Sequence, residues 1–214
     1  MTSLIELDSV GVTIGNNPIL DAIDLVVAPG DSVAVIGPNG SGKTTLLRVI
    51  ATLLRPTSGR VVVMGTDTSE DMGANRGQGN GFITHEPGLL AELTLEENLV
   101  HFSRLSGEDP SAVAQALYAV GLENVASRRV SDASFGMKRR AEIAWQLIAK
   151  PRLVLLDEAR SGLDEGARSL IDSLTVLTVS RGGAVVSVSH ELPSQGDEWP
   201  QTVLELSNGR LIPR

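Results

Sequence analysis

The chain has 214 residues, of which 42% are hydrophobic and 21% are charged, and its formal net charge is −8. These values predict one globular domain and exclude an intrinsically disordered chain. The acidic balance argues against a nucleic-acid-binding protein, because phosphate contacts require a basic face. With no cysteine in the sequence, a disulfide framework and a zinc–thiolate site are excluded.

The first fifteen residues lack the basic segment and apolar stretch of a secretory leader, so we expect none. No apolar run approaches the ~20 residues that a membrane-spanning helix needs. We therefore expect any role at a membrane to be exerted through a partner protein.

The first third of the chain predicts short strands at 4–7, 10–14, 23–27, 32–36 and 60–64, separated by turn sequences. Between the last two strands, apolar residues at helical spacing predict a helix from Lys43 to Leu54. Residues 66–81 are polar and rich in glycine. We interpret them as a mobile surface connection and not as a second phosphate loop, because no helix begins behind them.

The middle of the chain predicts helices over 95–126, divided near 107–110 by a cap at Asp109 and a helix start at Pro110. A further helix should end at Lys150, before Pro151. Its apolar face is formed by Met137, Ala141, Ala144, Trp145 and Ile148.

The last third predicts a buried strand at 153–156, a helix at 170–179 and a strand at 184–189. A hairpin that turns at Asn208 and Gly209 closes the chain. Strands that alternate with helices in this way predict an α/β sheet with an inserted helical segment.

The strongest motif is GPNGSGKTT at 37–45, a full match to the phosphate-loop pattern G-x-x-x-x-G-K-[ST]. Its glycines let successive backbone N–H groups point at one anion, and the following helix adds its positive end. Lys43 would reach the β- and γ-phosphates, and the Thr44 hydroxyl would bind Mg²⁺. The expected nucleotide-binding residues are Gly37, Pro38, Asn39, Gly40, Ser41, Gly42, Lys43, Thr44 and Thr45.

Two carboxylates follow the apolar strand that ends at Leu156. Ligands of an α/β sheet lie at this end of its strands, so we expect Asp157 to hold Mg²⁺ and Glu158 to polarise the water that attacks the γ-phosphate. His190 follows the strand 184–189 and would bond a γ-phosphate oxygen. A histidine in an ordinary surface loop is the alternative interpretation of His190.

The order GPNGSGKTT, DASFGMKRR, RLVLLDEARSGLD and SVSH resembles the nucleotide-binding subunit of an ABC transporter over nearly the whole chain. The resemblance implies an α/β P-loop NTPase of the ABC ATPase type, with a mixed sheet core, an N-terminal antiparallel β subdomain and an inserted helical subdomain at about 86–150. Residues 1–214 would form one nucleotide-binding domain. Its cofactors would be ATP and Mg²⁺.

The resemblance also implies two kinds of partner. A second copy of the chain would bury ATP between the two subunits, with Ser134 and Gly136 contacting the γ-phosphate from the opposite subunit and Asp164 at the seam. Ser134 could equally cap a helix, and both roles are compatible. A polytopic membrane subunit would hold the chain at the cytoplasmic face of the inner membrane, contacting the loop at His85 and Glu86.

Three positions depart from the usual ABC pattern. The signature LSGGQ is replaced by ASFGM at 133–137, and the loop that usually carries glutamine has His85 and Glu86. Ile14 stands where an aromatic residue normally stacks on adenine. Because Mg²⁺ prefers oxygen ligands, His85 would bond a water and not the metal, or leave metal contact to Glu86.

The string HEPGLLAELTLEENLVHF, with the signature SFGMKRR, is similar to the ATP-binding subunit of the cytochrome c maturation haem-export system. Phe135 and Ala159 depart from that branch. Leucines at 89, 90, 93 and 95 either form a groove for the membrane partner or belong to the core of the helical subdomain. The alternatives are an ABC exporter of another substrate, a soluble regulatory ABC ATPase, and a P-loop kinase, which SFGMKRR and SGLD disfavour.

Overall fold

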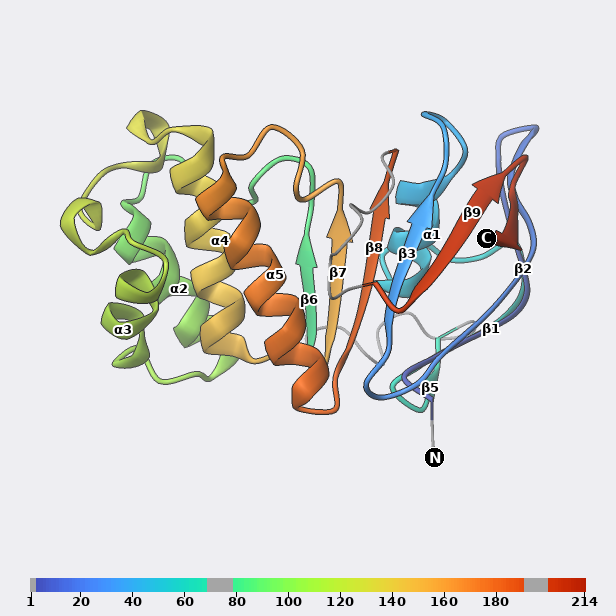
Figure 1. The fold of residues 1–214 in the computed structure, drawn as a ribbon, viewed down its shortest axis with the longest axis horizontal. Coiled ribbons are helices and arrows are strands. Elements are labelled where there is room, and N and C mark those ends of the chain that lie inside the picture. The colour runs from blue at the N-terminus through green and yellow to red at the C-terminus, as the bar shows by residue number, and fades with distance from the viewer. Residues whose placement is uncertain (1–2, 69–78, 191–199) are drawn as a thin grey trace.

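The computed structural model describes residues 3–68, 79–190 and 200–214, which contain two β-sheets and five α-helices (Figure 1). A four-stranded sheet has the order β2-β1-β4-β5, and a six-stranded sheet has the order β10-β9-β3-β8-β7-β6. Helix α1 packs between the sheets, and α4 and α5 cover the opposite face of the larger sheet. Most of the surface connection predicted at 66–81 lies outside the described residues.

The smaller sheet is antiparallel and consists of β1 (Ile5–Ile14), β2 (Asn17–Val27), β4 (Ser58–Val63) and β5 (Thr66–Asp67). The two strands predicted at 4–7 and 10–14 are one strand, so that boundary was wrong. Its pairing with β2 shifts register between Leu7 and Val10, and Ser9 between them has a φ of 50°. A bulge of this kind interrupts the hydrophobic alternation without ending the strand.

The larger sheet has a parallel core of β3 (Ser32–Ile36), β8 (Ala184–Ser189), β7 (Leu153–Asp157) and β6 (Asn80–Ile83). Strand β9 (Thr202–Ser207) joins it in parallel, and β10 (Arg210–Pro213) pairs antiparallel with β9. The predicted hairpin is confirmed, with Asn208 and Gly209 at φ 49° and 76°. Positive φ at both turn residues is the geometry that favours Asn-Gly.

Helix α1 (Lys43–Ile50) is shorter than the helix predicted to extend to Leu54. The chain leaves the helix at Thr52, which has a φ of 59°. That left-handed conformation cannot continue a right-handed helix, so it ends the helical run although the apolar spacing goes on.

The remaining helices are α2 (Leu95–Ser106), α3 (Ala112–Ala119), α4 (Phe135–Ala149) and α5 (Glu165–Ser180), with 3-10 turns at Glu123–Val125 and Val130–Asp132. The break predicted near 107–110 is confirmed, but α3 begins at Ala112 and not at Pro110. Asp109 accepts hydrogen bonds from the Ser111 backbone and hydroxyl, so it stabilises the turn before the helix. Helix α5 begins five residues before the predicted 170 because Asp164 caps it.

Two hydrophobic cores flank the larger sheet. Leu153 and Leu155 of β7 face the core around α1, whereas Val154 and Leu156 face the core beneath α4 and α5. This alternation is what a strand buried on both faces produces. Across residues 3–68, 79–190 and 200–214, no helix has the length and apolarity needed to cross a membrane.

Candidate functional site

The loop at 37–42 joins the end of β3 to the start of α1. Gly40 and Gly42 have φ values of 82° and 103°, so the backbone curls just before the helix begins. The Lys43 ammonium donates to the carbonyl oxygens of Gly37 at 2.8 Å and Pro38 at 3.0 Å, and therefore lies over the loop. The Ser41 hydroxyl is buried and has no hydrogen-bond partner within the described part of the chain. An unpaired hydroxyl donor beside an ammonium and a helix N-terminus fits a phosphate oxygen.

Gly37 is held in place by packing as well as by the geometry of the loop. A Cβ atom at this position would lie 2.4 Å from the carbonyl oxygen of Leu206 in β9. Strand β9 is more than 160 residues away in the sequence, so sequence reasoning gave no sign of this constraint.

The structure brings Thr44 and Asp157 together. The Thr44 hydroxyl donates to Asp157 Oδ1 at 3.2 Å, which joins the start of α1 to the end of β7. Burial raises the pKa of Asp157, with Glu158 adding to the rise, while the Thr44 hydrogen bond and the charges of Arg48 and His85 oppose it. A hydroxyl and a carboxylate oxygen side by side are the hard ligands that suit Mg²⁺.

Glu158 directly follows β7 with a φ of 48°, and its backbone N–H donates to the carbonyl oxygen of Val188 at 3.0 Å. His190 follows β8, the neighbouring strand. Its Nδ1 lies 3.4 Å from Glu158 Oε2, and its side chain is 44% exposed. The two residues therefore form a pair at the carboxyl ends of β7 and β8, and Glu158 is next to Asp157 in the sequence.

Ser134 and Gly136 lie at the start of α4, which packs on the opposite face of the larger sheet from α1 (Figure 1). The Ser134 hydroxyl accepts a hydrogen bond from the Met137 backbone N–H at 3.3 Å, which confirms the predicted helix cap. Among the residues that the structure describes, no atom lies within 4 Å of a Cβ built at Gly136, so there is open space at this position. The structure does not bring these residues to the phosphate loop of their own subunit.

Asp164 caps α5 by accepting a hydrogen bond from the Ala167 backbone N–H at 2.7 Å. It also lies 3.2 Å from the guanidinium of Arg140 on α4. The hydrogen bond from Ala167 and the charge of Arg140 lower the pKa of the Asp164 carboxyl.

The side chains of His85 and Glu86 are exposed on the loop that follows β6, and backbone contacts shape this loop. The Thr84 hydroxyl donates to the Glu86 carbonyl oxygen at 2.7 Å, and Arg139 of α4 donates to the His85 carbonyl oxygen at 2.7 Å. Sequence reasoning missed Arg139 and its partner Glu142. The signal was an arginine and a glutamate one helical turn apart on a face otherwise lined by apolar residues.

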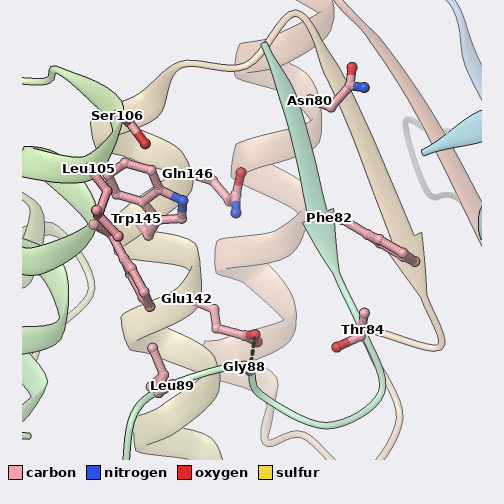
Figure 2. Close-up of a pocket in the computed structure, with 11 residues that line it drawn as sticks. Asn80, Phe82, Thr84, Gly88, Leu89, Leu105, Ser106, Glu142, Trp145 and Gln146 are labelled. Carbon is pink, nitrogen blue, oxygen red and sulfur yellow. Dashed lines mark hydrogen bonds between the residues drawn. The ribbon is translucent and has the colours of Figure 1, made fainter. Parts of the chain in front are cut away.

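Glu142 also borders a cavity of about 370 Å³ between β6, the loop after it, α2 and α4 (Figure 2). Leu89, Leu105 and Trp145 supply apolar walls, and Glu142 and Gln146 supply polar ones. Of the leucines with two possible roles, Leu95 is fully buried in the helical core, Leu90 is 42% exposed and Leu89 lines the cavity.

A glycine loop that curls around a lysine, with a threonine hydroxyl bonded to an aspartate at the end of a buried strand, defines the class of P-loop nucleoside triphosphatases. The family model described as ABC transporter matches residues 20–161, which is more than half of the chain. The chain therefore belongs to the ABC transporter family, and its fold confirms the predicted ABC ATPase architecture.

Three curated relatives show how broad this family is. The chain is 36% identical to the Nod factor export ATP-binding protein I of Rhizobium meliloti, over 97% of this chain and 63% of that protein. It is 35% identical to the lipoprotein-releasing system ATP-binding protein LolD 1 of Rhodopirellula baltica, over 92% and 89% of the two chains. It is 38% identical to the zinc import ATP-binding protein ZnuC of Pseudomonas putida, over 89% and 70%.

Two solved structures share the fold. An ATP-binding subunit of an ABC transporter is 27% identical with a TM-score of 0.88, over 98% of this chain and 88% of that chain. The dimeric structure of MJ0796, a bacterial ABC transporter cassette, is 25% identical with a TM-score of 0.85, over 97% and 96%.

These relatives do not single out the haem-export branch suggested by residues 85–102. Their names give Nod factor export, lipoprotein release and zinc import, at similar identity to this chain. The shared sequence therefore supports the assignment of an ABC ATP-binding subunit, and it does not favour one cargo over the others.

Proposed function

We propose that this chain is the ATP-hydrolysing subunit of an ABC membrane transporter and that it works as a dimer with a second copy of itself. The observation that carries the proposal is the hydrogen bond between Thr44 and Asp157, which joins the phosphate loop to the end of β7. Glu158 and His190 stand beside it as a pair. The groups that would bind phosphate, bind the metal and orient the water thus lie together at the carboxyl ends of strands β3, β7 and β8.

In this proposal the loop at 37–45 wraps the phosphates of ATP with its backbone N–H groups, and Lys43 contacts the β- and γ-phosphates. Thr44 and Asp157 would hold Mg²⁺, which neutralises charge on the phosphate oxygens when bound. Glu158 orients the attacking water. His190 donates a hydrogen bond to the γ-phosphate while its contact with Glu158 keeps both side chains in place.

The second copy completes the site. Ser134 and Gly136 begin a helix on the opposite face of the larger sheet from α1, and they offer a hydroxyl and open space at that helix N-terminus. They would contact the γ-phosphate bound by the opposite subunit, with Asp164 at the seam between the two. The similarity to a cassette described as dimeric supports this arrangement.

The membrane partner would dock at the loop of His85 and Glu86 and at the cavity beside Leu89 (Figure 2). That partner would place the chain at the cytoplasmic face of the inner membrane. The cargo would be chosen by the membrane subunit and not by this chain. Relatives named for several cargos favour a transporter of unspecified cargo. Haem export is a second candidate, favoured by the string at 85–102 and by the signature SFGMKRR.

The test is the substitution Glu158→Gln, which keeps the size of the side chain but removes the base. A general base contributes roughly 10²–10⁴-fold in rate, so we expect ATP hydrolysis to fall by about that factor. The variant should form a dimer with ATP and Mg²⁺ that gel filtration with light scattering detects. A variant that stays monomeric with ATP and hydrolyses at the normal rate would contradict the assignment.

The transporter assignment is tested separately, by purifying the tagged chain from detergent-solubilised membranes of its native cell. We expect a polytopic membrane protein to co-purify, and its identity would distinguish haem export from other cargos. Recovery of the chain without any membrane protein would favour the soluble regulatory ATPase.

A further inference from the structure

A buried ion pair ties the first turns of α4 to the loop at 84–90. Arg139 is fully buried, and its Nη1 lies 2.7 Å from Glu142 Oε2, one helical turn further along. Arg139 Nη2 donates to the His85 carbonyl oxygen at 2.7 Å. The other carboxylate oxygen of Glu142 accepts a hydrogen bond from the Gly88 backbone N–H at 2.8 Å (Figure 2).

The pair thus holds both ends of the segment 85–88, through a carbonyl oxygen at one end and an N–H at the other. These contacts are charge-assisted and shielded from water, which strengthens them. If the loop moved away from the helix, Arg139 and Glu142 would lose these contacts while still buried, which is unfavourable. The helix and the loop are therefore constrained to move together.

The same arginine touches the segment that precedes it. The Arg139 guanidinium lies 5.4 Å from the centroid of the Phe135 ring, which stands between Ser134 and Gly136 and is 39% exposed. A guanidinium over an aromatic face at this distance is attracted to it. One buried ion pair therefore contacts the start of α4 on one side and the loop of His85 on the other.

We propose that Arg139 and Glu142 are positioning residues that transmit movement between the start of α4 and the loop at 85–88. The proposal rests on the proposed function, in which Ser134 and Gly136 meet the ATP of the second copy and the loop meets the membrane subunit. Closure of the dimer on ATP would shift the start of α4, and the ion pair would carry that shift to the loop.

The experiment measures hydrogen–deuterium exchange of the amides at 85–90 in the full chain, with and without ATP and Mg²⁺. Every protein carries Glu158→Gln so that ATP is not consumed. We expect ATP to change the exchange rates of these amides at least threefold in this parent protein. Adding Glu142→Ala should leave the ATP concentration for half-maximal dimerisation within about twofold of the parent value, and should reduce the ATP-induced change in exchange to less than half.

Glu142→Gln is the graded variant. Its amide oxygen can still accept from Gly88, but it carries no charge to pair with Arg139, so we expect an intermediate response. It also decides the test if the alanine variant fails to fold. The control is Arg60→Gln, which breaks the exposed ion pair between Arg60 and Asp67 on the other sheet and should keep the full response.

A full ATP response of the loop in Glu142→Gln would overturn the proposal, as would a parent dimer whose loop does not respond to ATP. Failure of the parent protein to dimerise with ATP would instead overturn the proposed function, so the two failures are distinguishable.

Discussion

Glu142 carries a carboxyl group whose pKa burial raises from its ordinary 4.5 to about 7, against the opposing effects of Arg139 and the Gly88 hydrogen bond. Between these two pH values the folded protein holds the proton that the unfolded chain has released. The free energy of unfolding should therefore fall as the pH rises through this window and stop falling from this cause above about 7.

Glu142→Gln tests that pH dependence. The substitution removes the titrating group, so the difference in free energy of unfolding between wild type and variant should change with pH by up to about 3 kcal/mol between pH 5 and pH 8. Urea denaturation at four pH values would measure it. Glu92→Gln, at an exposed glutamate, is the matched control for the substitution itself. Parallel pH profiles for wild type and Glu142→Gln would contradict the prediction.

At the scale of single residues, the sequence was enough to predict the groups whose chemistry follows from a short motif. Lys43 and Thr44 stand inside one nonapeptide, and Asp157 and Glu158 follow a strand that is visibly apolar. The contacts of the Arg139–Glu142 pair with the loop could not be predicted, because the groups it meets there are a carbonyl and an N–H 54 residues earlier in the chain. A backbone partner leaves no trace in side-chain identity.

At the scale of elements, the approach of β9 to the phosphate loop gives a direct prediction for Gly37→Ala. The added Cβ would lie 2.4 Å from the Leu206 carbonyl oxygen, and a backbone atom cannot yield as a flexible side chain can. We expect a loss of about 1–3 kcal/mol in the free energy of unfolding, together with weaker ATP binding. Thermal and urea unfolding would measure the loss.

Gly136→Ala is the control for stability, because the added Cβ meets no atom of residues 3–68, 79–190 and 200–214 within 4 Å and the position is helical. Its stability should equal or slightly exceed that of wild type, since alanine favours the helix. Equal stability of Gly37→Ala and wild type would show that the loop and β9 can separate without cost.

Element types were predictable and their ends less so. The apolar runs of β3, β7 and β8 are typical of strands buried on both faces, and the spacing in α4 follows the 3.6-residue period of a helix. Helix α1 ends early because Thr52 takes a left-handed conformation, and β1 continues through a bulge at Ser9. Both boundaries depend on backbone conformations that the spacing of apolar residues does not reveal.

At the scale of the whole molecule, the net charge of −8 bears on assembly of the proposed dimer. Two subunits of the same sign repel each other, and salt screens that repulsion. The ATP-bound dimer of Glu158→Gln should therefore become tighter as ionic strength rises from roughly 50 mM to roughly 300 mM. Analytical ultracentrifugation with ATP and Mg²⁺ would measure the dissociation constant. A dimer that weakens steadily with salt would show that ion pairs across the seam outweigh the net charge.

The sequence by itself determined the α/β class, the phosphate loop, the two carboxylates at the end of β7 and membership of the ABC ATPases, because each depends on short motifs, on their order along the chain or on the periodicity of single elements. Tertiary structure decided that Thr44 bonds Asp157 and that Glu158 lies beside His190. It also decided that a buried ion pair on α4 forms hydrogen bonds with the loop at 85–88. Those contacts join residues that are 32 to 113 positions apart, and only the packing of the strands and helices brings them within reach.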